Sequence, residues 1–453
     1  MKRIIVACDG TGQSSSRGAH SVSTNVNRIC HALLNSEDSP IQQIVFYQSG
    51  IGTSDLGVGY NVGKMVQGAV GDGLDDNVAD AYAFVMNNFL PGDEIFIFGF
   101  SRGAFTARVL ANIIARLGIF RKPNYAWGFK KAMAAYMAGT FDEYLLELEK
   151  SKALDKQYWK PEKGPFLPRV YEAEVKVVGC WDTVASLGVP MHPITNGGGV
   201  SGEYKHFNGD LAKGIKHAFH ALALDECRGP FTPTLWFLPE NDKSIDLQQC
   251  WFPGVHSNVG GSYADQALAD LTLAWMIDLC RPFLDFNDQY INMMTDLNLH
   301  PEKMKSKDRD AIGDHDKTYQ GYGCGRIYDS YKRGQTWTWK YRTPKQYEGK
   351  GETNETIHPC VRSRWTKTRE PGRTQYAPES LKGFVLRQNG SGAWEWAKTV
   401  ESGAGWWPFG RKGEIKELVI PEGALLAAPA GVDGGSLLDA KDSFETRLRK
   451  DFQ

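Results

Sequence analysis

The strongest chemical signal in the chain is a serine between two glycines, in the segment GFSRG at 99–103. The apolar run EIFIF precedes it and the helix-forming run AFTARVLANII follows it, which is the context of a nucleophile elbow. A turn this sharp needs small residues beside the nucleophile, and Gly99 and Gly103 supply them. The pattern predicts that the Ser101 hydroxyl stands at a helix N-terminus, where the helix dipole favours developing negative charge.

A serine hydroxyl becomes nucleophilic at neutral pH only with a base beside it, and the base needs an acid that orients it. In α/β-hydrolases the acid and then the histidine follow the serine along the chain, in loops after later strands. Asp182 follows the apolar run VKVVG and His256 follows QCWFP, so both have this order and position. We therefore expect His256 to take the proton of Ser101 and Asp182 to orient the imidazole.

Other acids and histidines stay open as alternatives. Asp265 and Asp270 lie just beyond the histidine; either would break the usual chain order but could still lie near His256 in space. His220 lies in a run that we interpret as helical, and His358 precedes a proline, so both are weaker candidates for the base.

The loop DGTG after the first apolar run has two interpretations. In a hydrolase, the backbone N–H of Gly10 or Thr11 would be the second oxyanion donor, beside the N–H of Arg102. A strand followed by DGT also resembles the start of a phosphatase of the haloacid-dehalogenase type, which needs a nucleophilic Asp two residues before Asp9. That position is Ala7, which argues against phosphoryl chemistry.

Apolar runs and helical patterns alternate along the chain, which predicts an α/β fold with a mostly parallel sheet and helices on both faces. The expected strands are 3–8, 43–48, 94–98, 175–179, 235–238 and 249–253, and the expected helices 24–34, 74–89, 104–117 and 265–279.

Two segments depart from this alternation. Residues 121–170 are rich in aromatic side chains and helical in pattern, which predicts an inserted cap that is either a packed helical layer or a mobile lid. We expect an α/β-hydrolase catalytic domain at 1–365 and a C-terminal extension of unknown role at 366–453. This extension is rich in glycine and tryptophan and is expected to pack on the core as a β-rich cover; a surface patch for lipid is the alternative.

The overall composition argues against several classes of protein. The chain has 52 Lys and Arg residues and 53 Asp and Glu residues, and this balance of charge gives no reason to expect nucleic-acid binding. No run reaches the roughly 20 apolar residues of a membrane span, and the first apolar run is too short for a signal-peptide core. We expect a protein that is cytoplasmic, or exported without a cleaved signal peptide. The eight cysteines show no CxxC spacing, no metal site is predicted, and the chemistry requires no cofactor.

Five motifs, in this order, resemble the catalytic domain of the type VI secretion lipase effectors. They are DGTG, PGDEIFIFGFSRGAFTAR, VGCWDTVASLG, HALALDECRGPFTPTLW and WFPGVHSNVGGSYAD. The resemblance spans about 1–365 and implies that the family's nucleophile, acid and histidine correspond to Ser101, Asp182 and His256. It also implies a phospholipase.

The residues and the resemblance together predict a serine ester hydrolase that acts through an acyl-Ser101 intermediate, on phospholipids or other lipid acyl esters. A carboxylesterase of small cytoplasmic esters is one alternative. A non-catalytic binding protein on a hydrolase fold is another; the presence of all three chemical positions argues against it. Acyl length, head group and oligomeric state stay open.

Overall fold

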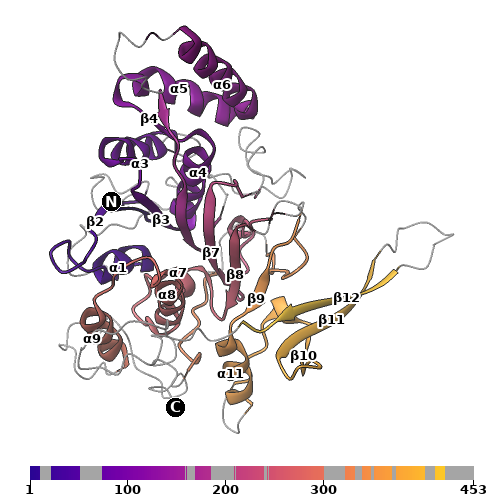
Figure 1. Cartoon of the computed structure of the whole chain (residues 1–453). Helices are drawn as coiled ribbons and strands as arrows, with labels where there is room; N and C mark the ends of the chain where they lie inside the picture. Colours follow the sequence, from indigo (N-terminus) through magenta and orange to yellow (C-terminus); the bar gives the residue numbers. More distant parts are fainter. Residues whose placement is uncertain are drawn as a thin grey trace, which may run out of the picture.

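The apolar runs form one seven-stranded sheet in the computed structural model, and every neighbouring pair is parallel (Figure 1). The strand order is β2-β1-β3-β6-β7-β8-β9. The strands are β1 (Arg3–Cys8), β2 (Gln43–Gln48), β3 (Glu94–Phe100), β6 (Val175–Trp181), β7 (Ile215–Ala223), β8 (Asp246–Phe252) and β9 (Glu355–Ile357). The structure describes residues 1–10, 22–50, 74–158, 160, 169–184, 209, 211–238, 242, 244–299, 322–331, 339–347, 351–369, 374–402 and 414–423.

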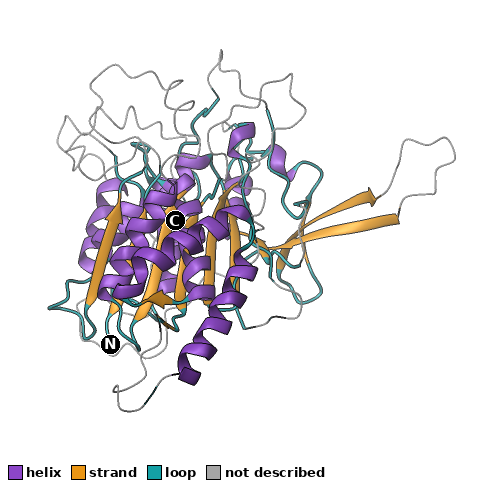
Figure 2. Ribbon diagram, turned by 90° about the horizontal axis from the view of Figure 1, so that it is seen from above, coloured by secondary structure: helices purple, strands orange, loops and turns teal. Residues whose placement is uncertain are grey.

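Helices cover both faces of this sheet (Figure 2). They are α1 (Asn25–Ala32), α3 (Leu74–Asn88), α4 (Ser101–Leu117), α7 (His256–Gly260), α8 (Ala267–Cys280) and α9 (Asp288–Leu299). Side chains alternate along a strand, so Ile4 and Val6 of β1 join one apolar core with α3 and α4, whereas Ile5 joins another with α1 and α8. The predicted α/β fold with a mostly parallel sheet is confirmed.

One predicted strand is wrong, and two strands of the large sheet, β7 and β9, were missed. Residues 235–238 form no strand, and the place between β6 and β8 belongs to β7, which contains His220. The run HAFHALA within β7 favours a helix by its alanines and leucine, and a strand buried on both faces shows no alternation that would reveal it. Parallel pairing on both sides overrides that local preference.

The aromatic-rich insertion forms an additional helical layer. It contains β4 (Ile119–Phe120), α5 (Lys122–Ala138), α6 (Phe141–Tyr158) and β5 (Val170–Tyr171), and β4 pairs with β5. The Tyr125 hydroxyl of α5 donates to the Ala79 carbonyl of α3 at 3.2 Å, and the Phe129 ring lies 4.5 Å from that of Tyr82. The insertion therefore packs on the outer side of α3 in this structure; its role as a lid stays a prediction.

A small antiparallel sheet packs at the far edge of the large one. It contains β10 (Val385–Gln388), β11 (Trp394–Ser402) and β12 (Glu414–Pro421), and α11 (Pro359–Lys367) lies nearby. Trp396 and Ile420 share an apolar cluster with Trp251 of β8 and Ile357 of β9, so the described part of the extension covers the core. In the described ranges, no helix has the length and apolar character needed to span a membrane.

Candidate active site

Three predicted site residues follow strands that end at the same edge of the large sheet. Ser101 comes directly after β3, Asp182 directly after β6, and His256 shortly after β8. The last residue of β3, Phe100, pairs with the last residue of β6, Trp181. The ends of β7 and β8 are aligned in the same way. Because all these strands are parallel, their carboxyl ends meet at one edge, where α/β proteins place their ligand sites.

The backbone at Ser101 is strained in the way a nucleophile elbow requires. Its φ angle is 59°, in the left-handed region that residues other than glycine rarely adopt. A Cβ atom on Gly103 would lie 2.2 Å from the Cys8 carbonyl oxygen, and one on Gly99 would lie 2.5 Å from Cα of Ala104. Glycine at both positions is therefore a steric necessity. Such strain costs about 1–3 kcal/mol and is characteristic of functional sites.

His256 and Asp182 are in direct contact inside the protein. Nδ1 of the histidine lies 2.6 Å from Oδ2 of the aspartate, and both side chains are buried. An Nδ1–H that donates to Asp182 leaves Nε2 as the basic nitrogen. The Phe100 ring lies 4.7 Å from the imidazole, and Phe100 directly precedes Ser101. Burial lowers the pKa of His256, although the bond to Asp182 opposes this shift.

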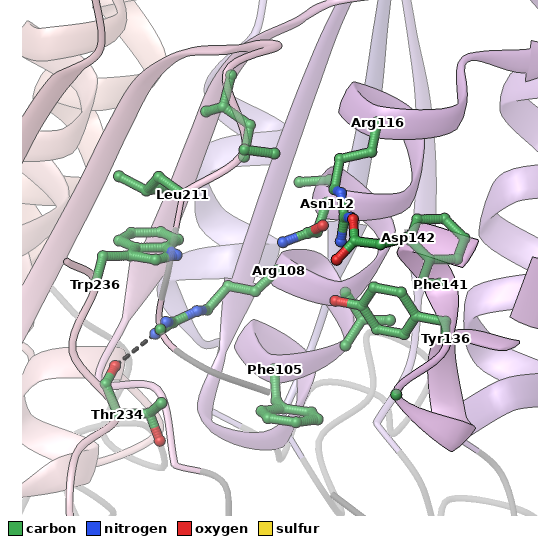
Figure 3. A pocket seen from close by; sticks show the side chains of 16 residues that line it. Phe105, Arg108, Asn112, Arg116, Tyr136, Phe141, Asp142, Leu211, Thr234 and Trp236 are labelled. Carbon is green, nitrogen blue, oxygen red and sulfur yellow. Dashed lines mark hydrogen bonds and ion pairs between the residues drawn. The ribbon is translucent and has the colours of Figure 1, made fainter. Parts of the chain in front are cut away.

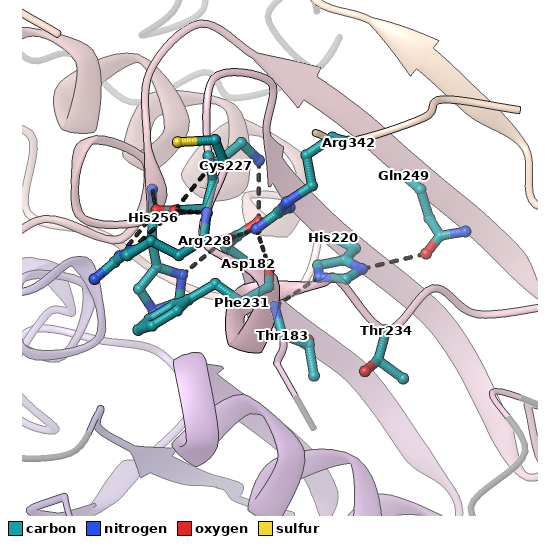
Figure 4. Close-up of polar contacts among 12 residues, drawn as sticks. Asp182, Thr183, His220, Cys227, Arg228, Phe231, Thr234, Gln249, His256 and Arg342 are labelled. Carbon is teal, nitrogen blue, oxygen red and sulfur yellow. Dashed lines mark hydrogen bonds and ion pairs between the residues drawn. The ribbon is translucent and has the colours of Figure 1, made fainter. Parts of the chain in front are cut away.

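The other partner of Asp182 is Arg342, which the sequence analysis missed (Figure 4). The guanidinium binds both carboxylate oxygens, with Nη1–Oδ1 at 2.9 Å and Nη2–Oδ2 at 3.0 Å, and the Ala223 N–H donates to Oδ1 at 3.0 Å. Burial alone would raise the pKa of Asp182, but Arg342 and His256 together hold it well below its usual range. No local motif marks Arg342, which is 160 residues away from Asp182 in the chain.

A second set of side chains supports the imidazole. Phe231 packs edge-on against His256 with 4.9 Å between ring centroids, and the Arg228 guanidinium lies 3.6 Å from the centre of the Phe231 ring. The buried carboxylate of Glu226 binds Arg228 at 2.8 Å and accepts the backbone N–H of His256 at 3.3 Å. These contacts hold the histidine in addition to its acid, and sequence reasoning missed all three supporting residues.

The two alternative acids are bound elsewhere. Asp265 accepts backbone N–H groups of Ala267 at 2.9 Å and Arg326 at 3.1 Å, so it braces a loop. Asp270 forms a buried ion pair with Arg28 between α1 and α8. The structure instead brings the predicted acid, Asp182, to the imidazole.

The two alternative bases have structural partners. His220 accepts the Thr183 N–H at Nε2 (3.0 Å), and its Nδ1 lies 3.2 Å from Gln249 Oε1. Burial lowers the pKa of His220 to about 3, so it stays neutral. His358 caps α11 by accepting the Cys360 N–H at 3.3 Å.

The loop after β1 lies beside the nucleophile. A Cβ atom on Gly10 would be 3.4 Å from Cβ of Ser101, so the backbone approaches closely there. The Gly10 N–H donates to the Asp9 carboxylate at 2.7 Å, and the Tyr47 hydroxyl donates to that carboxylate at 2.5 Å. Thr11 lies outside the described residues. The N–H of Arg102 belongs to the first turn of α4, where amide groups have no partner within the helix.

A cavity of about 430 Å³ runs beside α4 (Figure 3). Phe105, one helical turn beyond Ser101, lines it together with Tyr136 and Phe141 of the insertion and Trp236. Arg108 also lines the cavity; its guanidinium lies over the Trp236 ring at 4.3 Å and donates to backbone carbonyls. The cavity has the size of a small-ligand pocket, and its walls combine aromatic rings with charged side chains. Within the described ranges, no cluster of three or more His, Cys, Asp or Glu side chains could hold a metal ion.

Comparison with known proteins identifies a family. The model of the family described as "T6SS, Phospholipase effector Tle1-like, catalytic domain" matches residues 2–279. The chain is 30% identical over 262 residues to "Uncharacterized protein YEL023C" of Saccharomyces cerevisiae, which covers 55% of this chain and 35% of that protein. A solved structure, "Crystal structure of an uncharacterized protein from Pseudomonas aeruginosa", shares 15% identity over 70% of this chain and 49% of its own, with a TM-score of 0.36. The chain thus spans about a third of the curated relative and half of the solved one.

Proposed function

The chain belongs to the catalytic-domain family of Tle1-like phospholipase effectors of type VI secretion, and on this premise we propose that it is a serine ester hydrolase of lipid acyl esters. One observation carries the proposal. Ser101, in a strained backbone conformation, follows β3 at the sheet edge that also holds the Asp182–His256 pair. Acyl transfer needs a serine at the same edge as an imidazole that is oriented by a carboxylate, and Phe100, which precedes Ser101, packs on that imidazole.

The reaction proceeds in two steps. The Oγ atom of Ser101 attacks the acyl carbon while its proton moves to Nε2 of His256. The bond to the alcohol then breaks, and the alcohol oxygen takes that proton. In the second step a water gives a proton to His256 and attacks the acyl carbon, which releases the carboxylic acid and restores Ser101.

Two features of the site stabilise the charges that develop. The imidazolium formed in each step lies 2.6 Å from the ionised Asp182, which also prevents the ring from turning. The oxyanion lies at the N-terminus of α4, with the Arg102 N–H as its first donor. The second donor is expected from the loop after β1, from the N–H of Gly10 or Thr11; the Gly10 N–H is bound to Asp9, and Thr11 lies outside the described residues.

A lipid acyl ester is the substrate class that the family and the cavity favour. Phe105 lies one helical turn from the nucleophile, and Tyr136 and Phe141 continue the cavity wall further along α4, where Phe141 packs on Arg116. These rings offer apolar surface to an acyl chain. The partly buried guanidinium of Arg108 in the same cavity supports a second candidate, a carboxylesterase of short polar esters. The length of the preferred acyl chain separates the two.

Labelling with a fluorophosphonate probe tests the proposal directly. We expect wild-type protein to be labelled at one serine and Ser101→Ala not to be labelled, with a loss of about 10⁶ in turnover of p-nitrophenyl esters. Circular dichroism of the variant should match the wild type, since the side chain removed is small. Labelling at a different serine, or no labelling of folded wild type, would refute the assignment and leave a binding protein on a hydrolase fold.

A further inference from the structure

The guanidinium of Arg342 makes more hydrogen bonds than the orientation of one carboxylate requires. It binds both oxygens of Asp182, and its Nη2 also donates to the carbonyl of Phe231 at 2.6 Å. We propose that Arg342 is a positioning residue of the triad, which balances the charge of Asp182 while His256 is neutral and fixes both partners in place. This inference rests on the proposed function.

Burial makes this charge balance necessary. The side chain of Asp182 is 0% exposed and that of Arg342 is 1% exposed, so water can screen neither charge. A buried carboxylate without a cation beside it favours a proton close by, and the imidazole bound to Asp182 would hold that proton, so His256 would no longer be a neutral base. Arginine suits this position because its planar fork matches both carboxylate oxygens, which a lysine ammonium cannot do.

The bond to Phe231 links the acid to the surroundings of the base. The Phe231 ring packs on His256, so one guanidinium fixes the carboxylate and the backbone of the residue that packs against the imidazole. Arg342 therefore contacts the acid directly and reaches the base through Phe231.

The charged groups around Asp182 and His256 determine in which direction the loss of Arg342 shifts the pKa of His256. Asp182 and Glu226 are acidic and Arg228 and Arg342 basic, so their charges cancel while His256 is neutral. His220, which also lies near Asp182, is uncharged. Removal of Arg342 leaves one net negative charge beside the imidazole. That charge favours the protonated ring, so the pKa of His256 should rise.

Arg342 lies beyond the segment that the family model matches, which ends at residue 279. The matched segment supplies the serine, acid and histidine, whereas the charge balance of the acid comes from the later segment 339–347. We therefore use the full chain for every test.

Nuclear magnetic resonance of histidine labelled at Cε1 measures the titration of His256 whether or not the protein is active, and His256→Gln assigns the signal. We expect Arg342→Met to raise the midpoint by about half to one pH unit, and Arg342→Lys, which keeps the charge, to return it toward the wild-type value. The acid limb of kcat/KM should move in the same direction. If Arg342→Met does not fold, Arg342→Gln removes the charge and retains a polar group.

Arg28→Met is the matched control, because Arg28 also belongs to a buried ion pair with an aspartate, Asp270. This control should lower stability and leave the His256 midpoint unchanged. A midpoint that is unchanged when the Arg342 charge is removed, or that rises equally in Arg342→Lys, would overturn the inference. The titration also separates the two proposals, since inactive wild type refutes the ester hydrolase while the midpoints still decide the role of Arg342.

Discussion

The imidazole of His256 and the carboxylate of Asp182 meet at 2.6 Å although 74 residues separate them in the chain. The contact arises because β6 and β8 are parallel and both end at the edge where β3 delivers Ser101. A histidine oriented in this way presents its second nitrogen, Nε2, as a base. The contact with Asp182 therefore determines how we expect turnover to respond to substitutions and to pH.

Loss of the acid should reduce catalysis severely. In Asp182→Asn an amide replaces the acceptor of Nδ1–H, which favours the wrong tautomer, so we expect kcat to fall about 10⁴-fold. The change also leaves Arg342 without its carboxylate, so the free energy of unfolding should drop by about 3–5 kcal/mol. Steady-state kinetics and urea denaturation measure the two effects. Asp265→Asn, the control, should change kcat far less; the reverse ranking would make Asp265 the acid.

The elbow glycines should tolerate no side chain. A Cβ on Gly103 would lie 2.2 Å from the Cys8 carbonyl, so Gly103→Ala should displace β1 or α4 and lower the free energy of unfolding by more than about 3 kcal/mol. Gly390→Ala is the matched control, because nothing lies within 4 Å of its Cβ position. Urea denaturation of both variants checks this. Equal stability of the two variants would mean that the elbow is not as tight as described.

The pH dependence of kcat/KM should follow the protonation of His256. Burial lowers the pKa of His256 below its ordinary value of about 6.5. The base must be neutral to accept a proton, so kcat/KM should be lost as the pH falls through a midpoint below about 6.5, and be constant above it. Initial rates between about pH 4.5 and 8 define the limb. A midpoint above pH 7 would show that Asp182 outweighs burial.

The acyl chain should bind in the cavity beside α4. Each buried CH₂ contributes about 0.8 kcal/mol, so four more methylenes offer up to about a hundredfold in kcat/KM. We expect medium and long p-nitrophenyl esters, and phosphatidylcholine, to be cleaved with higher kcat/KM than the acetyl ester. Phe141→Ala, which opens the cavity wall, should flatten this dependence.

Phe129→Ala is the control for this series, because Phe129 belongs to the same insertion but packs on Tyr82. It should preserve the dependence on chain length. A steady fall in kcat/KM above four carbons, with no cleavage of phospholipid, would favour the small-ester hydrolase instead.

Local sequence was sufficient for features that depend on neighbours in the chain. The apolar run, the flanking glycines and the helical run around Ser101 are contiguous, so steric rules for a strand-to-helix turn predict the elbow. Asp182 and His256 follow apolar runs that form parallel strands, and the shared edge of such strands places their ends together. The same reasoning failed at β7, because a fully buried strand has no alternation and its alanine-rich run suits a helix.

The tertiary structure decided what depends on contacts between distant segments. Arg342 carries no motif, and only the folded chain shows that its fork binds Asp182 and the Phe231 carbonyl. Likewise, only the folded chain brings the Tyr47 hydroxyl to the Asp9 carboxylate, 38 residues away in the chain. The sequence by itself therefore predicted a nucleophile and the chain order of its partners. The charge balance of the acid came from packing, because a buried ion pair is selected by three-dimensional proximity, which residue spacing does not encode.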